Sequence, residues 1–418
     1  MVRTVLKNCI LIDGEGNDPL HDGVLVVDAG RVEWTGSVEA WEGEGPGDCV
    51  IDMKGSYVLP GLWDMHLHLA YRDLKDVSAA ATVPSDVMFS YRRALTFLNG
   101  GVTTLRLVGS RDGIDFTLRD GINAGEFVGP RIFTAGEGIA STGGHGSRNG
   151  QGCDGPYEFR RAAREIVWRG ADLVKVMVTG GISGRHETYD APQTLRDEVE
   201  AVVEVAHNWG KKVAGHVASA QAAIMCARAG LDTVEHGYAL NEESIAVMKE
   251  CGTAYIPTTV VTDRPQYWER IGTADWAVRK IRLARDGHRR SIQMAMEAGI
   301  PMAIGTDIPT ATVDGVPVTV WEMEALVGLG ASSRDVIKWA TAGAARICGV
   351  ENEVGTLTVG KRADLVAVAG NPYENISNLR DVCLVMTDGR IVRNDLEGDA
   401  VGLAAGVLEG YAPTCCDG

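Results

Sequence analysis

The chain has no excess of basic residues and no long apolar run. Its 40 Lys and Arg residues face 56 Asp and Glu residues, which gives a formal net charge of −16 at pH 7. Because contact with nucleic-acid phosphates needs a basic face, this balance argues against a nucleic-acid partner. No stretch of about 18 apolar residues is present, so neither a transmembrane helix nor a membrane partner is expected.

A disulfide framework and a signal peptide are also missing. The nine cysteines are odd in number and scattered, which predicts free thiols and a reducing compartment. The first segment, MVRTVLKNCILIDGEGN, lacks the apolar core of a signal peptide, since Lys7 and Asn8 interrupt it. We therefore expect a cytoplasmic protein. Cys415 and Cys416 are expected to be exposed and prone to oxidation, and the sequence assigns them no role.

The middle of the chain predicts an α/β fold. Its 418 residues exceed one minimal core and fit a large barrel with a small accessory unit. Between residues 56 and 350, short apolar segments alternate with amphipathic helical ones, the signature of βα units. The eight candidate strands are YVLPGLW, VTTLRLVG, RIFTAG, DLVKVMVTG, KKVAGHV, DTVEHG, TAYIPTTV and PMAIGTD. This number predicts a (β/α)8 TIM barrel.

The two ends of the chain read as β-structure. Residues 1–55 contain a hairpin signal around Asp28-Ala29-Gly30, and residues 351–400 contain another at Asp388-Gly389. Neither end has enough strands to be stable alone, so we expect them to pair. The prediction is a small β-sandwich-like domain built from both termini, followed by a C-terminal tail at residues 401–418.

Two histidines stand close together in the segment YVLPGLWDMHLHLA. In an extended strand, His66 and His68 would point to the same face, because side chains alternate. A pair of imidazoles aimed at one spot is a common start of a metal site, although two unrelated polar residues at a strand end would look the same.

The remaining strand ends decide between these interpretations. In a barrel, side chains at the C-terminal ends of the strands face the active site. Residues of types that bind metal stand at four more of the predicted strand ends: Lys175, His216, His236 and Asp307. Their coincidence predicts a metal site. The contexts of His21, His207 and His288 instead predict ordinary surface polar residues.

Lys175 lies in the apolar segment ADLVKVMVTGG. A protonated lysine is costly to bury there, and both burial and neighbouring metal charge would lower its pKa. The neutral amine can react with carbon dioxide to give a carbamate, which can bridge two metal ions. The alternative is an ordinary ion pair between Lys175 and Asp307.

The motifs DMHLH, GHV, EHG and GTD, with the strand-four lysine between the first two, resemble the amidohydrolase superfamily over nearly the whole chain. The segment VGTLTVGKRADLVAV resembles that family's return to its β domain. The resemblance implies two divalent metal ions, most often zinc. His66, His68 and Asp307 would hold the more buried ion, His216 and His236 the other, and carboxylated Lys175 would bridge them.

Such a site implies hydrolysis of an amide or a similar C–N bond. Metal ions lower the pKa of bound water, and Asp307 would take up the proton and pass it to the leaving amine. A deaminase with one metal ion remains an alternative, although HVASAQ supplies no acid after His216. A hydrolase of a cyclic amide, carbamate or urea is another alternative. A metal-free binding module would be expected to lack ligands, and all six are present.

Three loop features bear on the substrate. His145 in STGGHG could donate to a substrate oxygen, and Tyr238 in EHGY could stabilise an oxyanion, although a surface loop and simple packing would also explain them. Arg185 in ISGRHET could bind a carboxylate. STGGHG and EHGY, with the Gly-rich segment VKVMVTGGISG, resemble a branch near imidazolonepropionase that includes metal-dependent, prolidase-like Xaa-Pro and Xaa-Arg dipeptidases. The segment ISGRHET, which contributes Arg185, departs from the dipeptidase pattern. That resemblance implies a small-molecule substrate, either a dipeptide (Xaa-Pro or similar) or an N-acyl amino acid. A homo-oligomer is compatible with the sequence.

Overall fold

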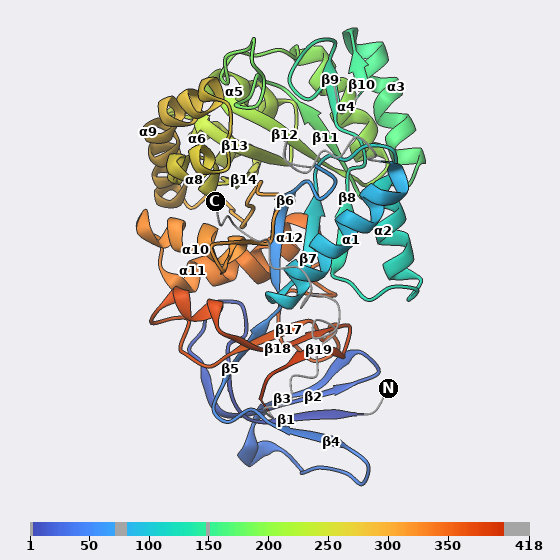
Figure 1. Cartoon of the computed structure of the whole chain (residues 1–418), viewed down its shortest axis with the longest axis vertical. Helices are drawn as coiled ribbons and strands as arrows, with labels where there is room; N and C mark the ends of the chain where they lie inside the picture. The colour runs from blue at the N-terminus through green and yellow to red at the C-terminus, as the bar shows by residue number, and fades with distance from the viewer. Residues whose placement is uncertain (1–2, 72–81, 148–150, 397–418) are drawn as a thin grey trace, which may run out of the picture.

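The computed structural model describes residues 3–71, 82–147 and 151–396, and Figure 1 shows that these form two parts. Strands from both ends of the chain make a lower part, and alternating strands and helices make an upper part. The predicted tail and the two cysteines within it lie outside the described residues. Within those residues, no helix combines the length and the apolar character that crossing a membrane requires.

The lower part is a single eight-stranded sheet. Its strands run in the order β19-β18-β17-β5-β1-β2-β3, and β4 pairs with β1 beside β5. Their bounds are β1 Thr4–Leu11, β2 Leu20–Asp28, β3 Arg31–Ser37, β4 Cys49–Asp52, β5 Tyr57–Pro60, β17 Leu365–Val368, β18 Val382–Thr387 and β19 Arg390–Asn394. The predicted sandwich is thus one continuous sheet, because β5 pairs with β1 on one side and β17 on the other.

Both predicted hairpins are present in this sheet. Ala29 and Gly30 join β2 to β3, and Asp388 and Gly389 join β18 to β19. All four residues have positive φ angles, as tight hairpin turns require. The core of the sheet contains apolar side chains from both ends of the chain, among them Leu6, Leu25, Leu365 and Leu384. Neither terminal segment therefore has a complete core of its own.

The upper part is TIM-barrel-like, with two parallel sheets and surrounding helices. One sheet has the order β6-β7-β8, and the other has the order β10-β9-β11-β12-β13-β14. Their bounds are β6 Leu62–Leu67, β7 Val102–Leu107, β8 Arg131–Thr134, β9 Ile139–Ser141, β10 Gln151–Cys153, β11 Leu173–Met177, β12 Lys212–Ser219, β13 Thr233–Ala239 and β14 Ala254–Ile256. Six of the eight predicted strands are confirmed, and YVLPGLW is divided between β5 and β6. PMAIGTD forms one isolated bridge, between Met302 and Tyr255.

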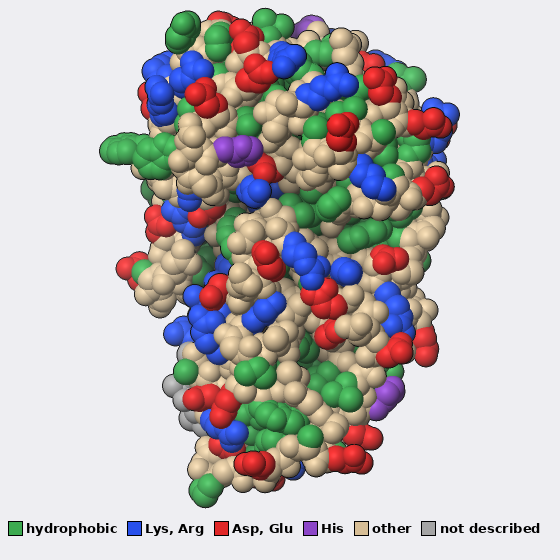
Figure 2. All heavy atoms as spheres, turned by 180° about the vertical axis from the view of Figure 1, so that it is seen from behind, with side chains coloured by type: hydrophobic (Ala, Val, Ile, Leu, Met, Phe, Trp, Pro, Cys, Tyr) green, Lys and Arg blue, Asp and Glu red, His purple; other side chains and the backbone are tan. Residues whose placement is uncertain are grey.

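Most of the helices follow a strand and lie on the outside (Figure 1). Their bounds are α1 Val83–Asn99, α2 Ile114–Asn123, α3 Gly155–Trp168, α4 Arg196–Asn208, α5 Ala220–Arg228, α6 Glu242–Cys251, α7 Val260–Asp263, α8 Pro265–Arg270, α9 Asp275–Ala298, α10 Val318–Gly328, α11 Ser333–Lys338 and α12 Ala344–Cys348. A short hairpin of β15 Thr312–Val313 and β16 Val316–Pro317 precedes α10. Figure 2 shows acidic and basic side chains interspersed over the opposite side of the molecule.

The segment YVLPGLW, expected to be one barrel strand, is divided at Gly61. Residues before it belong to the terminal sheet as β5, and residues after it belong to the barrel-like part as β6. A Cβ atom on Gly61 would lie only 2.1 Å from Oγ1 of Thr103. Glycine is therefore needed where the chain passes from one sheet to the other. This passage sets the direction of β6, which carries the first histidines of the site.

Candidate active site

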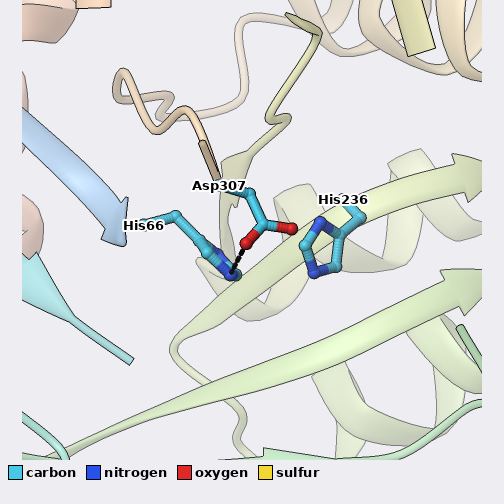
Figure 3. Close-up of side chains that lie close together, drawn as sticks. All are labelled: His66, His236 and Asp307. Atoms are coloured by element: carbon cyan, nitrogen blue, oxygen red, sulfur yellow. Dashed lines mark ion pairs between the residues drawn. The ribbon is translucent and has the colours of Figure 1, made fainter. Parts of the chain in front are cut away.

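Three side chains from separate segments of the barrel-like part converge. Figure 3 shows His66 at the end of β6, His236 from β13 and Asp307 from the segment that follows Met302. One ligand atom from each of these residues lies within 4.8 Å of those from the other two. Nitrogen and carboxylate oxygen atoms at this separation are a donor set that suits a divalent ion such as zinc.

The other predicted histidine ligands border this cluster. The ring centroids of His66 and His68 are 5.3 Å apart, and those of His216 and His236 are 4.5 Å apart. Nε2 of His68 lies 3.5 Å from Oδ1 of Asp307, and Nε2 of His66 lies 3.7 Å from the same oxygen. The ring centroids of His66 and His236 are 4.6 Å apart, so the four imidazoles form a continuous group, and Asp307 lies beside three of them.

Each of these four imidazoles has one ring nitrogen held by the protein. Nδ1 of His68 donates to the carbonyl oxygen of Gly109, and Nε2 of His216 donates to that of Gly180. Nδ1 of His66 lies 2.7 Å from Oε2 of Glu235, and Nδ1 of His236 lies 2.8 Å from Oγ1 of Thr258. Where the held nitrogen donates, the second nitrogen of the ring carries the lone pair, as metal binding requires. Burial lowers the pKa of all four, which keeps them neutral.

Lys175 is buried in β11, and its Nζ has no hydrogen-bond partner among the described residues. Burial lowers its pKa to about 8, against the opposing effect of Glu235. No ion pair joins Lys175 to Asp307 in the described structure, so the alternative interpretation of this lysine gains no support. An unsatisfied buried amine is costly unless another group completes the site.

Asp307 has a left-handed backbone conformation, with φ of +56°, and its amide donates to the carbonyl oxygen of His66 over 2.8 Å. This turn directs the carboxylate at the histidines. Burial raises the pKa of Asp307 to about 7, although Lys175 acts in the opposite direction. A carboxylate with a raised pKa is a better proton acceptor than an ordinary aspartate.

The model of the Amidohydrolase family matches residues 57–392, which include all six predicted ligands. The chain belongs to the amidohydrolase family. It is a hydrolase of carbon–nitrogen bonds, as the motifs predicted. Proteins of this family generally bind divalent metal ions, and the cluster of His66, His236 and Asp307 fits that property.

Similar proteins cover almost the whole of this amidohydrolase. Ochratoxinase from Aspergillus niger is 30% identical over 412 residues, which cover 89% of this chain and 82% of the ochratoxinase. The crystal structure of a Xaa-Pro dipeptidase with bound methionine is 30% identical with a TM-score of 0.86, and the match covers 93% of this chain and 99% of the dipeptidase. A prolidase complexed with N-methylphosphonate-L-proline is 27% identical with a TM-score of 0.85, covering 94% and 100%.

Sequence reasoning missed a buried ion pair beneath the ligands of this amidohydrolase. Glu235 accepts from Arg106 over 2.7 and 2.8 Å and from Thr233 over 2.5 Å, in addition to its contact with His66. Arg106 also donates to the carbonyl oxygen of Met65 over 2.6 Å. Glu235 precedes His236 in the motif TVEHG, and that proximity was the one available signal. Its partner on β7 could not be inferred without the fold.

A second buried carboxylate, Asp64, supports the loop that carries Asp307. Its Oδ1 accepts from the amide of Thr306 over 3.0 Å, and its Oδ2 accepts from the hydroxyls of Thr306 and Thr319 over 2.8 and 3.1 Å. Burial raises the pKa of Asp64 to about 6. Asp64 is the first residue of the motif DMHLH, but the motif alone does not indicate that its carboxylate supports the loop of Asp307.

Two of the three residues predicted to contact substrate lie beside the ligands. The ring of His145 stacks on that of His216 at 4.4 Å, and its Nδ1 lies 2.7 Å from Oε1 of Glu187. The ring of Tyr238 is buried and stacks on that of His236 at 5.3 Å. Arg185 is exposed and makes no hydrogen bond or ion pair within the described parts of the chain. It is not drawn into the cluster by any protein contact.

His288 was expected at the surface, and that expectation is wrong. The side chain is fully buried on α9, where its Nδ1 lies 2.8 Å from Oγ1 of Thr262 and its ring meets that of Tyr238 edge-on at 5.0 Å. Burial lowers its pKa to about 3, so the ring is neutral. The polar sequence around it misled the prediction, because α9 turns this position toward the strands. His21 and His207 are exposed as expected.

Proposed function

We propose that this amidohydrolase uses two divalent metal ions to cleave the C–N bond of a dipeptide, Xaa-Pro or similar, or of an N-acyl amino acid with a free α-carboxylate. The observation that carries the proposal is the buried Nζ of Lys175, which has no hydrogen-bond partner among the described residues and lies near enough to His66 and Asp307 to affect the pKa of both. An amine left this way is completed by carboxylation, which converts it into a two-oxygen anionic ligand.

The donor set fits zinc. His66, His68 and Asp307 would hold one ion, His216 and His236 would hold the other, and carboxylated Lys175 would bridge them. The bound ions supply an activated water molecule and polarise the substrate carbonyl. The protein keeps the histidines neutral by burial and fixes their orientation through Glu235, Thr258 and two backbone carbonyls.

The protein's own side chains would carry the protons and hold the substrate. Asp307, whose carboxylate lies beside His66 and His236, would accept a proton from the attacking water and deliver it to the leaving nitrogen. Burial raises the pKa of Tyr238 well above its usual value, which keeps the phenol protonated as a donor to the developing oxyanion. His145 would contact the substrate carboxylate, with Glu187 holding its other ring nitrogen. The exposed Arg185 would add a second contact only if its loop closes over the site.

Similarity to solved enzymes supports the choice of substrate. The related structures include a Xaa-Pro dipeptidase and a prolidase bound to a phosphonate of proline, and both are similar over almost their whole length. The segment after His216, Val217 to Gln221, contains no acid, which weighs against a deaminase.

We also propose that the two parallel sheets close into a complete (β/α)8 barrel around this site. Several main-chain contacts support closure. The amide of Met65 donates to the carbonyl oxygen of Ile304 over 2.7 Å, and that of Tyr255 donates to the carbonyl oxygen of Pro301 over 2.9 Å, as expected if residues 301–304 lie between β14 and β6. The amide of Asp172 donates to Thr134 over 2.9 Å and connects the other boundary between the sheets.

The metal part of the proposal is tested with Lys175→Ala and, as a control, the exposed Lys212→Ala at the opposite end of the neighbouring strand. Elemental analysis should find about two ions per chain in the wild type and in the control. Lys175→Ala should lose most of the metal, and short carboxylic acids should partly restore it. One ion per chain would favour the deaminase alternative, and full metal content in Lys175→Ala would contradict the bridging role.

The substrate part is tested with a library of dipeptides and N-acyl amino acids, each paired with its C-terminal amide. Losing a charge-assisted hydrogen bond costs roughly 1.5–3 kcal/mol. The free acids should therefore turn over about 10- to 150-fold faster than their amides. Equal rates would contradict capture of the carboxylate. Cleavage of a carbamate, urea or cyclic amide alone would support the metal chemistry and reject the dipeptide.

A further inference from the structure

We infer that Thr258 and Glu322 form a positioning unit that orients His236 and Tyr238 in the site. The inference rests on the proposed role of His236 as a metal ligand. Thr258 lies two positions after the end of β14, and Glu322 lies on α10, 64 positions further along the chain. Both side chains are fully buried, and neither was singled out by the sequence.

The backbone of Thr258 is in an unusual conformation. Its φ angle is +52°, in the left-handed region that β-branched residues rarely adopt. Such a conformation persists only where the surroundings impose it, and it is concentrated at functional sites. His236, its partner, also has a positive φ of +71°. Two non-glycine residues with left-handed backbones thus meet through their side chains at the site.

The left-handed conformation of Thr258 brings its hydroxyl to the ring of His236. Its Oγ1 lies 2.8 Å from Nδ1 of His236. When Nδ1 donates to the hydroxyl, the lone pair is on Nε2, the other ring nitrogen and the remaining ligand atom. The Thr258 side chain also interacts with the phenol of Tyr238, whose ring stacks on that of His236. A single hydroxyl therefore connects a proposed ligand and the proposed oxyanion donor.

Glu322 holds the turn in place. Its Oε1 accepts from the amide of Thr259 over 2.8 Å, and its Oε2 accepts from the amide of Val260 over 2.7 Å. These two amides follow Thr258 immediately, so the carboxylate fixes the peptide planes on which its conformation depends. The two neighbouring amides each need an acceptor, and the two carboxylate oxygens of Glu322 supply both. A glutamine would present an NH2 group to one of the amides and would leave that amide without an acceptor.

An interpretation in which Glu322 only caps the short helix α7 makes a different prediction. In that case its loss would lower stability and leave metal binding unchanged. If Glu322 acts through Thr258, replacing Glu322 should weaken metal binding, as removal of the Thr258 hydroxyl should. The test therefore uses metal retention, which needs neither a known substrate nor catalytic turnover.

The variants are Thr258→Val, Thr258→Ala, Thr258→Ser and Glu322→Gln. The control is Glu324→Gln, on the same helix, where the carboxylate accepts from Ser377 and Arg380 instead. Each full-length protein is loaded with zinc, and the chelator concentration that removes half of the more weakly held metal is measured. Circular dichroism identifies the variants that are folded.

Thr258→Val and Glu322→Gln should lower that chelator concentration by about 10- to 100-fold, as expected when a partner of a ligating histidine is lost. Thr258→Ser should remain within about 3-fold of the wild type, since it keeps the hydroxyl. If Thr258→Val retains metal as well as the wild type does, the inference is overturned and the proposed function stays intact. If the Thr258→Val protein does not fold, the same criterion applies to Thr258→Ala. A wild-type protein that binds no zinc would overturn both.

Discussion

Replacing Glu235 with glutamine would remove one charge from a fully buried ion pair and keep the shape of the side chain. Glu235 is 0% exposed and Arg106 is 3% exposed, so water cannot solvate either charge if its partner is removed. The shortest distance between them is 2.7 Å. With an effective dielectric constant of about 20, this separation corresponds to a gross attraction of about 6 kcal/mol. Desolvation offsets part of it, and removal of one partner of such a pair typically costs about 3–5 kcal/mol.

The same substitution should weaken metal binding for a separate reason. The Glu235 carboxylate accepts from Nδ1 of His66, and a neutral amide is a weaker acceptor for that hydrogen bond. Loss of such a partner typically reduces metal affinity about 10- to 100-fold. Glu235→Gln should therefore show two defects, one in the free energy of unfolding and one in metal retention.

A double variant separates the two defects. Arg106→Met combined with Glu235→Gln leaves no unpaired buried charge and should recover most of the stability. Metal retention should stay low, because His66 still lacks the carboxylate. Urea unfolding and chelator competition measure the two quantities. Glu204→Gln, which breaks an exposed pair with Arg160, is the control and should cost less than about 1 kcal/mol.

The reasoning would be refuted by a Glu235→Gln protein whose stability lies within about 1 kcal/mol of the wild type. It would also be refuted by recovery of metal retention in the double variant, since that would assign the effect to the unpaired charge and not to His66.

Three further changes test other parts of the fold. Burial raises the pKa of Asp115 to about 7, so its carboxyl destabilises the folded chain increasingly as pH rises above about 4. Asp115→Asn should thus gain roughly 2–3 kcal/mol more stability at pH 8 than at pH 5, and a gain independent of pH would contradict the burial argument. Gly61→Ala would place its Cβ 2.1 Å from the Thr103 hydroxyl and should lose at least about 1–3 kcal/mol in urea unfolding. Gly328→Ala, with open space around its Cβ, should be unaffected or more stable, and equal stabilities of the two variants would count against the steric argument. Removing residues 351–418 takes β17 from its place beside β5 and should yield aggregated protein by sedimentation, whereas a soluble and active fragment would show that the terminal strands are independent.

Local patterns in the chain account for the types of residue at the site and for much of the secondary structure. Six of the predicted barrel strands, the helices that end before Gly210 and Gly230, and both hairpins follow local rules of alternation, capping and turn chemistry. The histidines and Asp307 could be grouped because strands in βα units end on the same face. Local patterns are sufficient for these features, since each depends on residues a few positions apart.

The buried groups that support the ligands depend on contacts between residues far apart in the chain. Glu235 meets Arg106 across 129 positions, and Glu322 meets the turn of Thr258 across more than 60. The alternation of a strand indicates which face a side chain occupies but not which distant residue lies opposite. The same limit explains His288. Its polar sequence context predicted a surface position, whereas the packing of α9 buries the side chain. It also explains β5, whose pairing with β17 depends on a strand more than 300 positions away. Partners of this kind are set by how the elements pack, because only packing brings the two charges or the two strand edges within bonding distance.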